Sequence, residues 1–163
     1  MSGRRDKTQN VLDPKGLPDP LQATAFRAVR FQEVDPMGVA WHGRYPEYLE
    51  DGRCAVAKAY GLDYEDFFRE GLKAPVVRLE VEYKQPLLMG QKFRIETSLL
   101  WTEAVRLNHH YVLRRESDGR VVTEARTVQL LLDFDDKLLL LWPPYFQKLR
   151  EKWKNGLLGR VDV

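Results

Sequence analysis

The chain has 163 residues, 44% hydrophobic and 31% charged, with 26 basic and 24 acidic side chains and a formal net charge of +2. That length suits one domain with a buried core, and the charge balance gives no reason to expect a nucleic acid or an anionic membrane as partner. A single cysteine, Cys54, excludes an intrachain disulfide and a cysteine-only metal site, and fits a reducing compartment. No apolar run approaches the ~18 residues of a membrane-spanning helix, and the N-terminus lacks the apolar segment of a secretory signal. These features predict a cytoplasmic protein without a membrane span.

The first predicted unit is a flexible tail over residues 1–23, which is rich in turn-forming residues and poor in large apolar ones. One domain is expected over residues 24–156. It opens with an alternating strand pattern over residues 24–33 and a break that contains a proline and glycines. Apolar or small residues at helical spacing then predict a helix over residues 45–60 that ends at Gly61.

A shorter helix over residues 64–70 follows, and the apolar period then changes from 3.6 to 2. Four alternating runs with short connections predict antiparallel strands over residues 77–83, 93–101, 105–113 and 121–134, and an amphipathic helix is expected over residues 144–154. One long apolar helix followed by a strand meander indicates the α+β class, with an antiparallel sheet wrapped around the helix.

Several catalytic motifs are absent from the sequence. It contains no G-x-S-x-G, no G-x-G dinucleotide fingerprint, no phosphate-binding G-K-[ST] loop and no H-E-x-x-H. His109 and His110 are adjacent in a predicted strand and point to opposite faces, so they do not share a metal. Cys54 is interpreted as a packing residue and the acidic residues at 133–136 as a solvated turn. We therefore predict no metal and no cofactor.

The segment with the clearest chemistry is EVDPMGVAWHGRYPEYLEDGR, residues 33–53. Asp35 precedes a proline, which disfavours helical backbone, and the helix is expected to begin near residues 43–45. This arrangement directs a carboxylate toward the free N–H groups of a helix start, as acyl transfer requires: the carboxylate acts as base or nucleophile, and the amides stabilise the oxyanion. The alternative interpretation is that Asp35 only caps the turn or the helix.

The same segment resembles the signature of the 4-hydroxybenzoyl-CoA thioesterase-like branch of the hotdog-fold acyl-CoA thioesterases. That pattern has D-x-x-G-x-V/A-x-[HY], then Tyr and a helix with E-x-x-R, and the matching residues are Asp35, Gly38, Ala40, His42, Tyr45, Glu50 and Arg53. The resemblance covers residues 24–134. It implies a hotdog fold, a homodimer or homotetramer with the active site at the dimer interface, and an acyl-CoA substrate whose CoA is part of the substrate rather than a cofactor.

Carried over to this sequence, the resemblance makes Asp35 the catalytic carboxylate and gives His42 an oxyanion-hole N–H and a side chain that orients water or substrate. Gly43, at the expected helix start, is assigned to substrate binding. Glu50 and Arg53 are expected to form a structural ion pair.

Three further side chains have two interpretations each. Arg44 replaces the asparagine of many relatives, and either reshapes the acyl pocket or binds an acidic group of the substrate. Tyr45 either lines the pocket or packs in the core. Arg106 either contacts the CoA phosphates or is a solvated strand residue.

The predicted function is hydrolysis of an acyl-CoA thioester to a free acid and CoA. One alternative is a hotdog dehydratase that acts on β-hydroxyacyl thioesters, in which His42 works with Glu47 or Glu50. The other alternative is an acyl-CoA-binding protein without catalytic activity.

Overall fold

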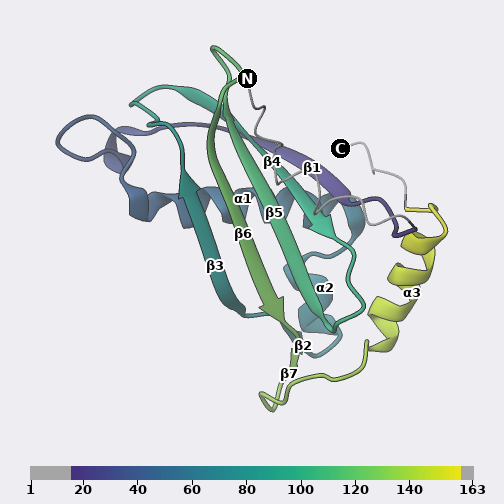
Figure 1. Cartoon of the computed structure of the whole chain (residues 1–163). Helices are drawn as coiled ribbons and strands as arrows, with labels where there is room; N and C mark the ends of the chain where they lie inside the picture. The colour runs from purple at the N-terminus through teal and green to yellow at the C-terminus, as the bar shows by residue number, and fades with distance from the viewer. Residues whose placement is uncertain (1–15, 159–163) are drawn as a thin grey trace, which may run out of the picture.

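A five-stranded antiparallel sheet and one long helix dominate the structure, a computed structural model that describes residues 16–158. The sheet has the order β1-β4-β5-β6-β3, and its strands are β1 (Leu21–Ala28), β3 (Val76–Tyr83), β4 (Lys92–Leu100), β5 (Arg106–Arg115) and β6 (Val121–Leu130). Two short strands, β2 (Leu72–Lys73) and β7 (Leu132–Asp133), pair separately. The helices are α1 (Tyr45–Tyr60), α2 (Tyr64–Arg69) and α3 (Pro144–Lys154). This arrangement confirms the predicted α+β class, and Figure 1 shows α1 lying across one face of the curved sheet.

The long helix α1 packs mainly on β1 and β4. Its first turn reaches the far edge of the sheet, where Tyr45 contacts Tyr83 of β3, and Ala125 of β6 is buried in the same cluster as Tyr45 and Tyr48. The close approach takes place at Gly52, where a Cβ atom would collide with the side chains of Thr97 and Ile95. Gly61 ends the helix in the left-handed conformation, with φ at 70°.

Two hydrophobic clusters make up the core. One gathers around Tyr48, Phe93 and Tyr111, and the other extends to α3 through the buried Phe146 and Trp153. Helix α3, yellow in Figure 1, covers the end of the sheet where β4 turns into β5. No helix within residues 16–158 is long and apolar enough to cross a membrane.

The beginning of the domain differs from the prediction. Residues 1–15 of the predicted tail lie outside the described residues, but β1 already starts at Leu21, whose side chain is buried. The strand also ends at Ala28 rather than near residue 33. The chain turns there because the Glu33 carboxylate accepts a hydrogen bond from the Arg30 N–H, which caps a short 3₁₀ turn, η1 (Phe31–Glu33).

Candidate functional site

Asp35 lies at the base of a tight loop that its own carboxylate helps to close. Oδ1 accepts hydrogen bonds from the N–H groups of Met37 (2.9 Å) and Val39 (3.2 Å), and the Asp35 N–H donates to the Val39 carbonyl (2.8 Å). Gly38 takes a φ of 77°, which side-chained residues resist. Oδ2 has no hydrogen-bond partner among residues 16–158. Oδ1 therefore caps the turn, as the alternative interpretation of Asp35 proposed. Oδ2 is not used in the turn and is available to react with a substrate.

The loop is held in place by a buried charge network around Glu33. This side chain is 3% exposed and accepts hydrogen bonds from Arg27 (2.6 Å), the Arg30 N–H (2.8 Å) and the Tyr48 hydroxyl (3.0 Å). Arg27 also pairs with Asp51 of α1 at 2.7 Å. Burial, followed by the hydrogen bond to Glu33, raises the pKa of Tyr48, so its hydroxyl stays a donor. The network ties β1, η1 and α1 together two residues before Asp35.

The start of the helix offers two amides without partners. A 3₁₀ turn, η2 (His42–Arg44), leads into α1, and the N–H groups of His42 and Gly43 donate to no group within the described chain. The His42 ring is exposed and lies 5.1 Å from the ring of Trp41, while its carbonyl accepts from the Tyr83 hydroxyl at 2.8 Å. A Cβ at Gly43 would collide with the ring of Trp41, so any larger residue there would force that half-exposed side chain to move.

A backbone hydrogen bond joins the segment before Asp35 to the segment before the start of α1. The Trp41 N–H donates to the Glu33 carbonyl at 2.9 Å, so Asp35 and His42 lie on segments that are bonded to each other. No hydrogen bond joins the Asp35 carboxylate to the helix start among the described residues.

The side chains of Arg44 and Tyr45 both make contacts that stabilise the fold around the start of α1. The Arg44 guanidinium binds Glu47 (2.9 Å) and the carbonyl of Gln32 (3.2 Å), which clamps η1 to the first turn of α1. Tyr45 is 2% exposed and packs edge-on against Tyr83, so the core-packing interpretation applies. Burial also raises the pKa of the Tyr45 hydroxyl.

Arg106 lies apart from the other residues that were predicted to form the site. It is exposed at the start of β5, where strand alternation places it opposite to Leu107, on the outer face of the sheet. There it borders a groove of about 300 Å³ whose other charged residues are Arg78, Glu80 and Arg126.

A second feature, on the face of the sheet that carries α1, is a cavity of about 620 Å³ that the sequence analysis did not predict. Its walls come from α1, α2, β5, β6 and the β2–β7 pair, and it opens beside the C-terminal half of α1. Cys54 is exposed and lines this space, so the prediction that it packs in the core is wrong.

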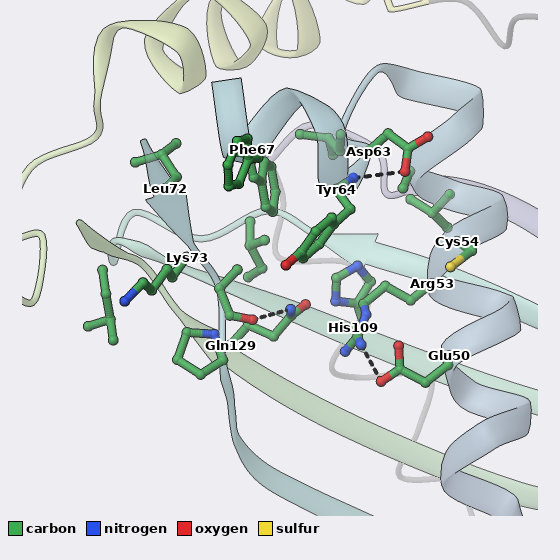
Figure 2. Close-up of a pocket in the computed structure, with 18 of the residues that line it drawn as sticks. Glu50, Arg53, Cys54, Asp63, Tyr64, Phe67, Leu72, Lys73, His109 and Gln129 are labelled. Atoms are coloured by element: carbon green, nitrogen blue, oxygen red, sulfur yellow. Dashed lines mark hydrogen bonds and ion pairs between the residues drawn. The ribbon is translucent and has the colours of Figure 1, made fainter. Parts of the chain in front are cut away.

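Polar side chains stand among the apolar walls of this cavity, as Figure 2 shows. Glu50 and Arg53 form the predicted ion pair on α1. His109 points inward from β5, and burial, aided by the Arg53 charge, lowers its pKa to about 3. The imidazole is therefore neutral at physiological pH.

Residues 16–158 contain no group of three or more histidine, cysteine, aspartate or glutamate side chains that could hold a metal ion together. The acidic residues after β7 build a turn, in which Asp133 Oδ1 accepts from the N–H groups of Asp135 and Lys137. Asp136 pairs with Lys73 at 2.7 Å.

Comparison with known proteins identifies the family of this chain. A family model described as the thioesterase-like superfamily matches residues 29–149, most of the chain. The chain belongs to this superfamily. The predicted resemblance to hotdog thioesterases is thereby confirmed.

Individual relatives of this thioesterase-like chain carry related names. A candidate acyl-CoA thioesterase of Bacillus subtilis, YneP, is 37% identical over 75 residues, which cover 46% of this chain and about half (52%) of the relative. A 1,4-dihydroxy-2-naphthoyl-CoA hydrolase of Synechococcus elongatus is 26% identical over 66% of this chain and 79% of the relative. The structure of the DHNA-CoA thioesterase from Staphylococcus aureus superposes with a TM-score of 0.73 at 25% identity, covering 80% of this chain and 89% of that one.

Proposed function

We propose that this protein hydrolyses acyl-CoA thioesters to a carboxylic acid and CoA. The proposal is carried by one carboxylate oxygen, Asp35 Oδ2, and the N–H groups of His42 and Gly43, which have no partners among residues 16–158 and lie on two segments that are bonded together. Membership of the thioesterase-like superfamily supports the same reaction.

In the proposed reaction the thioester oxygen lies against the free amides at the helix start. Oδ2 of Asp35 either attacks the carbonyl carbon directly or removes a proton from a water that attacks it. The negative charge that develops on the oxygen is stabilised by the amides and by the positive end of α1. Collapse of the tetrahedral intermediate breaks the C–S bond and releases CoA thiolate. If Asp35 is the nucleophile, water then hydrolyses the mixed anhydride.

A panel of acyl-CoA substrates with detection of the released thiol tests the proposal. We expect turnover of at least one member, with the free acid as second product. Tight binding of acyl-CoA esters without release of thiol would instead identify a binding protein, and a change in the enone absorbance of an enoyl-CoA would identify a dehydratase.

We also propose that two copies pair through β3. This strand is one edge of the sheet, and its side chains are almost all exposed, including Val77 (54%), Leu79 (43%) and Tyr83 (49%). An unpaired edge with exposed apolar residues favours strand addition. A second copy at this edge would extend the sheet and cover the cavity beside α1.

The pairing predicts that Leu79→Lys shifts the protein toward monomer, because a charge would be buried in the contact without a partner. The measurement is size-exclusion chromatography with light scattering. Phe26→Lys, on the opposite edge strand β1, is the matched control, since Phe26 is 68% exposed and lies away from the proposed contact. An unchanged mass of Leu79→Lys beside an oligomeric parent would place the contact elsewhere.

A further inference from the structure

The backbone carbonyl of His42 is held by a side chain from a distant part of the sequence. Its oxygen accepts a hydrogen bond of 2.8 Å from the hydroxyl of Tyr83, which is the last residue of β3 and lies 41 residues further along the chain. An α-helical hydrogen bond to this oxygen would come from residue 46, but that residue is Pro46, which has no N–H. The Tyr83 hydroxyl therefore supplies the donor that Pro46 lacks.

The same hydrogen bond acts on one of the two amides that the proposed reaction uses. The carbonyl of His42 and the N–H of Gly43 belong to one peptide unit, which is planar and trans, so the two groups point in opposite directions. Holding the carbonyl on Tyr83 therefore also sets the direction of the Gly43 N–H. A donor at the carbonyl polarises the peptide as well, and this cooperative strengthening is on the order of 10–30% for each hydrogen bond.

Tyr83 is itself held in place next to the start of α1. Its ring packs edge-on against Tyr45, with ring centroids 4.8 Å apart, and Tyr45 is buried. Burial raises the pKa of the Tyr83 hydroxyl, so the group stays protonated and able to donate at physiological pH. The turn that contains the peptide is anchored too, because the Trp41 N–H donates to the Glu33 carbonyl and the Arg44 N–H donates to the Trp41 carbonyl.

We infer that Tyr83 is a positioning residue of the hydrolysis, which orients and polarises the His42–Gly43 peptide so that the Gly43 N–H stabilises the oxyanion. Tyr83 does not touch the thioester in this role and acts only through the peptide. The role rests on the proposed function. Because the charge on the oxygen develops only in the transition state, the hydroxyl should affect kcat much more than KM.

Removal of the hydroxyl alone tests this role. Tyr83→Phe keeps the ring and its contact with Tyr45, and it should lower kcat for the best acyl-CoA substrate by about tenfold, with KM changed by less than about twofold. Loss of an entire oxyanion-hole donor costs about 10²–10³ in kcat, and the expected loss is smaller because the Gly43 N–H itself remains. The measurement is steady-state release of thiol.

A fluorinated tyrosine adds a readout that a purely structural role would not change. The hydroxyl of 3-fluorotyrosine is more acidic than that of tyrosine, so it is a stronger hydrogen-bond donor at nearly the same size. Introduced at position 83 and assayed at neutral pH, it should restore kcat to the parent value or above it. A kcat no higher than that of Tyr83→Phe would contradict the polarising role.

Tyr60→Phe is the matched control for Tyr83→Phe. The Tyr60 hydroxyl also donates to a backbone carbonyl, that of Gln22 at 3.0 Å, but it does so at the opposite end of α1. We expect kcat of this variant to stay within about twofold of the parent. Each of the two variants loses one hydrogen bond of the same kind, so each should lower the melting temperature by no more than about 4 °C.

Three results would overturn the positioning role of Tyr83. They are a parent-like kcat in Tyr83→Phe, a loss of kcat of the same size in Tyr60→Phe, and a loss in Tyr83→Phe that is accompanied by a lower mass in light scattering. The last result would assign the hydroxyl to the contact between two copies. Failure of the parent to release thiol from any acyl-CoA would instead refute the proposed function itself.

Discussion

Asp35→Asn should reduce kcat by roughly a thousandfold and leave the fold intact. The asparagine carbonyl can still accept the hydrogen bonds from the N–H groups of Met37 and Val39, so the loop keeps its shape. Its amide nitrogen takes the place of Oδ2 and serves neither as nucleophile nor as base. The measurement is steady-state thiol release on the best substrate of the panel, with circular dichroism melts to confirm that the variant is folded.

Glu47→Gln is the control for Asp35→Asn. Glu47 is another carboxylate near the helix start, but it is bound to Arg44. We expect activity within about twofold of the parent. Unchanged turnover in Asp35→Asn would remove Asp35 from the mechanism, and a large loss in Glu47→Gln alone would assign the required carboxylate to Glu47 instead.

The second large effect is expected for stability. Glu33→Ala should lower the free energy of unfolding by about 3–5 kcal/mol, because it leaves the Arg27 guanidinium, the Tyr48 hydroxyl and the Arg30 N–H without their shared acceptor. In a chain of this size such a loss lowers the melting temperature by roughly 10 °C. Thermal melts followed by circular dichroism measure it directly.

Two further variants serve as comparisons for Glu33→Ala. Asp51→Asn removes the more exposed carboxylate that binds Arg27 and should cost less than about 1 kcal/mol. Glu33→Gln should fall between the two, since one amide oxygen can still accept from Tyr48 or from the Arg30 N–H. A melting temperature of Glu33→Ala equal to that of Asp51→Asn would show that the buried network does not hold the loop.

Local sequence patterns predicted most of the fold. The helix over residues 45–60 was predicted with the bounds that the structure has, because its apolar positions repeat at helical spacing and Gly61 provides a left-handed stop. Strands β4 and β5 followed from alternation, since one face of each packs inward. The same alternation predicted β3, although its side chains are almost all exposed. The predicted strand over residues 121–134 is divided at Leu131 in the structure, where the chain leaves the large sheet to pair with β2.

Long-range contacts explain what the sequence did not reveal. Glu33 reads as an exposed acidic residue, and only the turn after Ala28 brings it back to Arg27. The cavity was missed because its walls come from segments between Glu50 and Asp136. Cys54 was misjudged for a related reason: helical periodicity tells which residues share a face, but not which part of the helix surface the rest of the fold covers.

The turn at Asp35 fixes the orientation of its carboxylate rather than the identity of its oxygens. A half-turn of the group exchanges two equivalent oxygens and restores the same two hydrogen bonds, so one oxygen is always held by the backbone amides of Met37 and Val39. The other oxygen is therefore always presented in the same direction, and the rotational freedom that a flexible side chain would lose on reaching the transition state has already been lost during folding.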